Sequence, residues 1–134
     1  MLLLRAEPMT SPRERGNILE RRARKQLEAE GYLVEPARPV LQWIGPGKVR
    51  SKRVDFFGAF DLFAVDPRHV RLIQVCEASG GHAAERRRKI EAIANKLPSS
   101  LSLELWVWHR PGRSKSQRGW SQERLAGGEW RPQV

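Results

Sequence analysis

Cysteine is almost absent from this chain, acidic residues are few beside the basic ones, and long apolar runs are missing. The single cysteine, Cys76, excludes an internal disulfide framework and a zinc site built from several cysteines. No apolar run approaches the roughly 18 residues of a membrane-spanning helix. Residues 2–4 meet Arg5 and Glu7 too soon to form the apolar core of a secretory signal. We therefore expect an intracellular, cytoplasmic protein with one domain over residues 1–134, a length that encloses a single sizeable core.

The shortage of acids leaves a strong positive charge. The chain has 25 lysine and arginine residues against 15 aspartate and glutamate residues, which gives a formal net charge of +10, and 19 of the 25 cations are arginine. Arginine presents a planar fork of donors that suits phosphate oxygens. A small domain with a pI near 11 is typical of nucleic-acid-binding proteins, although a solvated basic surface has the same composition. We expect DNA as the partner and no membrane. The scarcity of asparagine, with only Asn17 and Asn95, is typical of thermophile proteins.

Helical and strand-like patterns alternate along the chain. We expect a loose arm at residues 1–10, a helix capped by Ser11 that runs to Glu30, strands at 32–34 and 40–44, a basic loop at 48–53, an antiparallel hairpin of strands 59–65 and 70–76, a helix at 83–97, a strand at 101–109, and a peripheral loop and hairpin within 110–134. This order predicts an α/β fold with a central mixed β-sheet flanked by helices.

One acidic residue stands out because of its surroundings. Asp61 lies in the middle of the apolar segment 59–65, where an unpaired charge is costly. Because side chains alternate along strands, the expected hairpin brings Gln74 beside Asp61 on one face. Asp55 lies six residues upstream, and Glu20 lies at the edge of the apolar stripe of the first helix. Clustered oxygen ligands of this kind hold Mg²⁺ or Mn²⁺, and such an ion activates water for phosphodiester hydrolysis. The alternative is an acid satisfied by an arginine or a turn.

Several short motifs resemble those of a nuclease family. The segment Arg15-Gly16-Asn17-Ile18-Leu19-Glu20-Arg21 is similar to the first motif of archaeal-type Holliday junction resolvases, members of the PD-(D/E)XK, or restriction-endonuclease-like, superfamily. In that family the helix glutamate is followed by an aspartate on one strand and by Glu-x-Lys on the next. Asp61 matches the aspartate, and Gln74-Val75-Cys76 stands where Glu-x-Lys is expected. Ser51 corresponds to a serine in the loop between the first two motifs. The segment 55–61 also resembles phage and bacterial members of the superfamily.

The resemblance covers residues 13–97 and implies a restriction-endonuclease-like fold. It implies a metal-dependent endonuclease that acts on DNA as a homodimer, with four-way junctions among its substrates. Catalytic roles then fall on Glu20, Asp61 and Gln74, and metal binding on Asp55, Asp61 and Gln74. Two departures stand out: Gln74 lacks the charge of glutamate, and Cys76 replaces the lysine that helps to position water and stabilise the phosphorane.

Two arginines are candidates for replacing that lysine. Helical spacing places Arg86 and Arg87 on the inward half of the helix at 83–97, in its first turn. Either can act at the catalytic site, bind phosphate, or pair with Glu85 and Glu91. Trp43, beside the basic loop, is a candidate for stacking on an exposed base. The residues expected to contact nucleic acid are Arg15, Trp43, Arg50, Ser51, Lys52, Arg53, Arg86 and Arg87.

The missing lysine leaves two other functions open. One is a catalytically silent DNA-binding module of the same fold. The other is an interaction protein whose basic surface binds an acidic partner.

Overall fold

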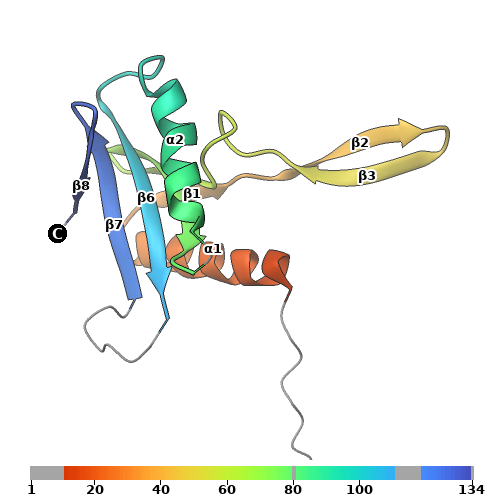
Figure 1. Ribbon diagram of the computed structural model, residues 1–134, viewed down its shortest axis with the longest axis horizontal. Coiled ribbons are helices and arrows are strands. Elements are labelled where there is room, and N and C mark those ends of the chain that lie inside the picture. The colour runs from red at the N-terminus through yellow and green to blue at the C-terminus, as the bar shows by residue number, and fades with distance from the viewer. Residues whose placement is uncertain (1–10, 80, 111–118, 134) are drawn as a thin grey trace, which may run out of the picture.

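A computed structural model describes residues 11–79, 81–110 and 119–133 (Figure 1). The arm expected at residues 1–10 and residues 111–118 of the expected peripheral loop lie outside the described residues. The elements are α1 (Pro12–Ala29), β1 (Leu33–Pro36), β2 (Pro39–Gly45), β3 (Lys48–Arg53), β4 (Leu62–Val65), β5 (Val70–Glu77), α2 (His82–Ala94), β6 (Leu101–His109), β7 (Gly119–Ala126) and β8 (Glu129–Pro132).

Six of the strands form one mixed sheet. Its order is β1-β4-β5-β6-β7-β8, and β2 and β3 form a separate two-stranded sheet. β5 and β6 run parallel, whereas the other neighbouring strands of the large sheet run antiparallel. A parallel pair needs a long crossover connection, and α2 provides it between β5 and β6. The expected mixed sheet flanked by helices is therefore confirmed.

Helix α1 covers one face of the sheet. The Ser11 hydroxyl accepts a hydrogen bond from the Glu14 N–H at 3.1 Å and caps the helix as expected. Gly31, with φ of +96°, follows the helix in a conformation that favours glycine. The buried core between α1 and the sheet contains Leu19, Ala23, Leu27, Leu62, Ala64, Ile73, Val75 and Trp106.

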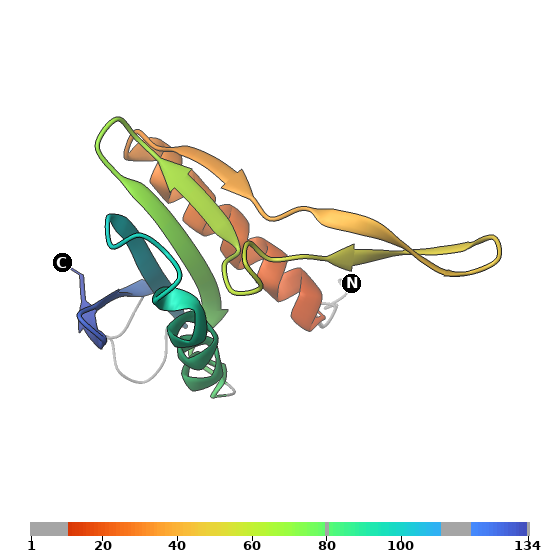
Figure 2. The same ribbon diagram turned by 90° about the horizontal axis from the view of Figure 1, so that it is seen from above.

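Helix α2 covers the opposite face, as the two views in Figures 1 and 2 show. Ile90 of α2 is fully buried against the sheet. The core on this side contains Ala59, Phe60, Leu72, Ile90 and Leu103, and a smaller cluster contains Cys76, Leu105 and Val107. Even-numbered side chains of β5 therefore face α2, and odd-numbered ones face α1.

The structure corrects the expected loop at residues 48–53, which is the strand β3. β2 and β3 pair through the turn at Pro46 and Gly47 and form an arm that projects from the body (Figures 1 and 2). We use the term "arm" for Pro39–Arg53. Within β3, Val49 and Ser51 alternate with charged residues, which is the two-residue period of a strand. The density of positive charge in the same segment is the reason why the sequence predicts a loop there.

Other boundaries also differ from expectation. The strand expected at 59–65 spans only Leu62–Val65, so that Asp61 lies just before it. α2 ends at Ala94, three residues earlier than expected. The expected hairpin near the C-terminus is present as β7 and β8, and β7 extends the large sheet beside β6. Within the described ranges, neither helix is long and apolar enough to cross a membrane.

Candidate active site and nucleic-acid interface

The sheet opens at the C-terminal end of β5. β4 begins only at Leu62, which pairs with Ile73, so the last residues of β5 extend past the start of β4. Asp61 bridges the gap. Its N–H donates to the Ile73 carbonyl at 2.8 Å, and its Oδ2 accepts from the Val75 N–H at 2.9 Å. The carboxylate thus accepts from the N–H of a β5 residue that lies past the last paired residue of β4.

This arrangement sets Asp61 across from the segment around Gln74. Its N–H and its carboxylate bond to the backbone of Ile73 and Val75, the two residues that flank Gln74 on β5. Asp61 and Gln74 are both buried, with exposed fractions of 6% and 2%. The amide Nε2 of Gln74 donates to the Val75 carbonyl at 3.4 Å, a long hydrogen bond.

A crevice with a volume of about 290 Å³ lies at this opening. Both helices reach it although they cover opposite faces, because the sheet is interrupted here. The edge is also the carboxyl end of the parallel pair β5 and β6, where open α/β sheets bind ligands. The crevice is lined by Arg15, Gly16 and Leu19 of α1, by Val75, Cys76 and Glu77 of β5, and by Ser79, His82 and Arg86.

Cys76, which stands where the resemblance implies a lysine, lines the crevice. Burial is the main cause that raises the pKa of its thiol to about 11. Smaller effects come from Arg86 and Arg87, which lower this pKa, and from Asp61, which raises it. The thiol is therefore protonated at neutral pH. A protonated, buried thiol is a poor nucleophile and a poor metal ligand.

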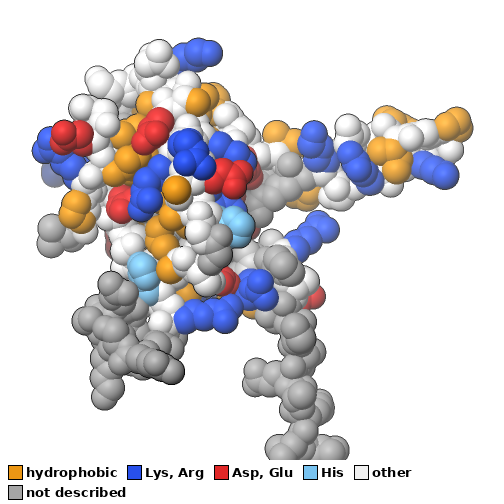
Figure 3. All heavy atoms as spheres, viewed as in Figure 1, with side chains coloured by type: hydrophobic (Ala, Val, Ile, Leu, Met, Phe, Trp, Pro, Cys, Tyr) orange, Lys and Arg blue, Asp and Glu red, His pale blue; other side chains and the backbone are white. Residues whose placement is uncertain are grey.

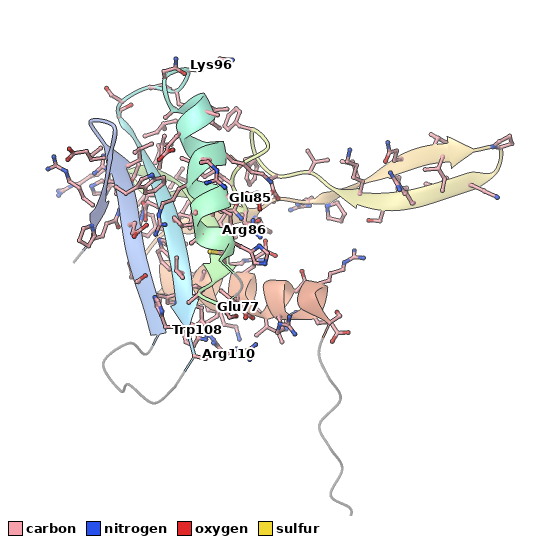
Figure 4. The ribbon with its side chains drawn as sticks, in the orientation of Figure 1. Glu77, Glu85, Arg86, Lys96, Trp108 and Arg110 are labelled. Carbon is pink, nitrogen blue, oxygen red and sulfur yellow. The ribbon has the colours of Figure 1, made fainter. Side chains whose placement is uncertain are left out.

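The two candidate arginines of α2 have different surroundings. Arg87 donates from Nε and Nη2 to the carboxylate of Glu123 on β7, at 2.8 and 2.9 Å. This hydrogen bond raises the pKa of Arg87, and burial opposes the shift. Glu123, and neither of the expected partners Glu85 and Glu91, forms this ion pair with Arg87. The Nε of Arg86 is buried and has no hydrogen-bond partner among the described residues. Of these two arginines, Arg86 is the one that lines the crevice (Figure 4), which Arg15 of α1 also lines.

Glu77 at the mouth of the crevice was not anticipated. Its carboxylate accepts from the Ser79 hydroxyl at 3.0 Å and from Arg110 Nη2 at 3.3 Å, and it lies 3.5 Å from Arg15 Nε. The parallel register pairs Glu77 with Trp108, which brings β6 residues to the same edge (Figure 4).

A second hollow of about 230 Å³ adjoins this edge and shares Arg15, Leu19 and Glu77 with the crevice. The guanidinium carbon of Arg22 lies 4.2 Å from the ring centroid of Trp108, within the range of a cation–π interaction. The unanticipated site residues are therefore Arg22, Glu77, Ser79, His82, Trp108 and Arg110. The parallel pairing of β5 with β6 would have pointed to Trp108 and Arg110.

The three acids Glu20, Asp55 and Asp61 do not form one metal-binding group. Among the described residues, no three histidine, cysteine, aspartate or glutamate side chains lie close enough together to hold a metal ion. The expected ligand set of Asp55, Asp61 and Gln74 contains only two carboxylates beside an amide oxygen, and it stays a prediction. That set fits Mg²⁺ when substrate phosphate and water supply the other ligands, as is common for this ion.

The arm carries most of the other expected contacts. Cross-strand partners share a face of a two-stranded sheet, and successive residues alternate between faces. The register pairs Gln42 with Arg50 and Val40 with Lys52. We call the face that carries these two pairs the basic face of the arm. On it, Arg50 Nε donates to the side-chain oxygen of Gln42 at 3.2 Å.

Ser51, expected to join the basic residues, lies on the other face, where it pairs with Leu41. Trp43 pairs with Val49 on that same face, and 74% of Trp43 is exposed. The side chain of Arg53 lies outside the described residues. The expected contacts on the arm are thus divided between its two faces.

Neither a protein-family model nor a curated protein matches this chain.

Proposed function

We propose that this chain is a metal-dependent DNA endonuclease of the restriction-endonuclease-like class, with its active site in the crevice at the end of β5. One observation carries the proposal: Asp61 bonds to the two residues that flank Gln74 on β5, Ile73 and Val75, and Arg86 lines the crevice at the end of that strand. The family resemblance implies an aspartate at the end of one strand and the Glu-x-Lys counterpart on the next. Asp61 lies just before β4 and Gln74 to Cys76 lie on β5, which supports the assignment.

Each side chain then has a defined task. Asp61 and Gln74 would hold the metal ion, which when bound would supply an activated water and neutralise charge on the phosphate. Arg86 stays protonated at any relevant pH, so it does not act as a base. Its guanidinium instead donates to phosphate oxygens and stabilises the charge that grows on them in the transition state.

Nucleic acid is held through its backbone. Arg50 and Lys52 lie on the basic face of the arm, and three arginines, Arg15, Arg22 and Arg110, line the hollow beside the crevice. Cations that contact phosphates carry no base information, so binding is expected to be strong at low salt and largely independent of sequence.

A second function, a catalytically silent DNA-binding module, is favoured by one observation. The position of the catalytic lysine holds Cys76, a buried thiol with a raised pKa, which neither positions water nor donates a strong hydrogen bond. A chain that had lost this lysine would keep the basic surfaces and lose cleavage.

The deciding experiment incubates the chain with plasmid, linear and four-way-junction DNA in Mg²⁺, Mn²⁺ or EDTA. We expect cleavage with a metal ion and none in EDTA. Asp61→Asn keeps an oxygen for the Val75 N–H, so it should abolish cleavage and leave DNA binding largely intact. Glu85→Gln, an exposed substitution on α2, is the matched control. Equal loss of cleavage and binding in Asp61→Asn would show that Asp61 is structural.

If the wild type cuts no DNA with either metal ion, Cys76→Lys separates the two functions. Cleavage by this variant alone would establish the silent module and refute the endonuclease. Binding is tested separately by reversing Arg50 and Lys52 to glutamate. This change should weaken binding to all sequences alike and reduce the salt slope by about 2, because each cation on a phosphate accounts for roughly one unit of slope. Arg88→Glu on α2 with Lys96→Glu just after it makes the same change in net charge and should have a much smaller effect.

A further inference from the structure

The two faces of the arm differ in character. One is the basic face described above. The other carries Leu41, Trp43 and Val49, which are 77%, 74% and 43% exposed, together with Ser51. We call this the apolar face of the arm. Figure 3 shows both kinds of side chain on the projecting arm.

The exposed apolar surface is concentrated here. Nine large apolar side chains are exposed among the described residues, and five of them lie on the arm: Val40, Leu41, Trp43, Ile44 and Val49. β2 and β3 pair with each other and make no extensive contact with another described element. A lone two-stranded sheet is at best marginally stable in water, and a contiguous apolar patch on a protein surface marks an interaction site.

We propose that the apolar face of the arm packs against the same face of a second copy of this chain, so that two arms form a four-stranded unit. The face is self-complementary because its two central pairs, Leu41 with Ser51 and Trp43 with Val49, contain no charged side chain. Two copies that each carry a net charge of +10 repel one another. They therefore associate most readily through these uncharged pairs, away from the base of the arm, where the register pairs Pro39 with Arg53.

Charge also argues for this occupant over nucleic acid. A phosphate backbone is recognised by cations, which lie on the opposite face of the arm as Arg50 and Lys52. Face-to-face packing places two sheets about 10 Å apart and leaves both basic faces pointing outward. The inference needs neither cleavage nor DNA, and it goes beyond the function proposed above.

The area involved predicts a weak complex. A buried aromatic side chain covers roughly 150–250 Å², so Trp43, Leu41 and Val49 at their exposed fractions supply about 300–400 Å² per copy. A stable interface of standard size buries about 800 Å² per partner. We therefore expect a dissociation constant of about 10–100 μM. Salt should strengthen this complex because it screens the repulsion between copies, whereas it weakens DNA binding.

The first test measures the mass of the full chain by sedimentation equilibrium over a range of concentrations in 50 mM and about 500 mM salt. The average mass should rise from 15.4 kDa toward twice that value, more readily at high salt. Leu41→Thr with Trp43→Thr keeps strand-forming residues and should stay at 15.4 kDa. Val40→Thr with Gln42→Thr, on the basic face of the same strand, should behave as the wild type. A wild type that stays monomeric at about 500 μM would overturn the proposal.

A second measurement holds even if the double variant folds poorly. Cys76 is buried, so Leu41→Cys places an exposed thiol on the apolar face and should form a disulfide-linked dimer under oxidation. Gln42→Cys, on the basic face, should not. Equal cross-linking at both positions would indicate pairing by strand edges and contradict face-to-face packing. If Leu41→Thr with Trp43→Thr weakens oligonucleotide binding without changing the mass, the face binds nucleic acid and the proposal is wrong.

Discussion

Replacing Glu104 by glutamine should be among the most damaging single changes to the fold. Glu104 is fully buried on β6. Its two carboxylate oxygens accept from Nε and Nη2 of Arg71, both at 2.7 Å, from the Ser102 hydroxyl at 2.7 Å, and from the Trp106 ring N–H at 3.0 Å. Burial alone would lower the pKa of Arg71, but the hydrogen bonds and charge of Glu104 outweigh it and raise that pKa. Arg71 is therefore charged at ordinary pH and forms a buried ion pair with Glu104.

The expected loss follows from what the substitution leaves behind. Glutamine keeps the shape of the side chain, but it removes the charge and points an NH₂ group at the donors of Arg71. Breaking a buried ion pair by removing one partner costs about 3–5 kcal/mol, and a domain has only about 5–15 kcal/mol of stability. We expect Glu104→Gln to lower the free energy of unfolding by about 3–4 kcal/mol, which corresponds to a fall in Tm of about 10–15 °C.

Urea unfolding followed by tryptophan fluorescence measures this loss. Glu85→Gln is the control, because Glu85 lies 3.9 Å from Lys89 in an exposed pair, and such pairs contribute at most about 1 kcal/mol. Arg71→Met combined with Glu104→Leu removes both charges and should cost less than Glu104→Gln alone. A loss below about 1 kcal/mol in Glu104→Gln would refute the reasoning.

Further predictions concern α2 and the thiol. Arg86→Ala should lower the single-turnover cleavage rate by a larger factor than it weakens DNA binding; equal factors would assign Arg86 to binding alone. Arg87→Ala breaks the ion pair with Glu123 and should lower the free energy of unfolding by about 1–2 kcal/mol in urea titrations, with little effect on cleavage beyond that loss. Burial raises the pKa of Cys76 from its ordinary 9.0 to about 11, so the folded chain holds a proton that the unfolded chain releases. The free energy of unfolding should therefore fall between pH 9 and 11, by up to about 3 kcal/mol. Comparison with Cys76→Ala isolates the contribution of the thiol. If the free energy of unfolding of the wild type and of this variant fell in parallel with rising pH, the prediction would be wrong.

Local signals predicted the elements that depend on neighbouring residues. The serine cap and the apolar spacing of α1 act within a few residues of the chain, so Ser11 and the stripe from Leu19 to Leu27 were sufficient to predict the helix. The hairpin of β4 and β5 was also predicted, because its strands are joined by a short turn that starts at Asp66. Strand alternation within that hairpin is the reason why the sequence predicts Asp61 and Gln74 as neighbours.

Misjudged elements had conflicting local signals. In β3, the strand period of Val49 and Ser51 was obscured by Lys48, Arg50 and Lys52. A two-stranded arm can carry those charges because both of its faces are exposed. The early start assigned to β4 has a different cause. The Val75 N–H of β5 bonds to the Asp61 side chain and not to the backbone of an extended β4. The apolar pattern of residues 59–65 does not reveal this substitution of a side-chain acceptor for a backbone one.

The residue types of the candidate site were determined by the sequence, but their grouping was decided by the tertiary structure. Glu77 and Arg110 are brought together by the parallel pairing of β5 with β6, a contact between segments separated by a whole helix. The same packing separates the roles of two adjacent arginines, because β7 offers Glu123 to Arg87 and leaves Arg86 at the crevice. Adjacent residues of a helix point about 100° apart, but helical periodicity places both arginines on the inward half of α2. Only the elements packed around the helix decide which of them meets a partner and which lines the opening.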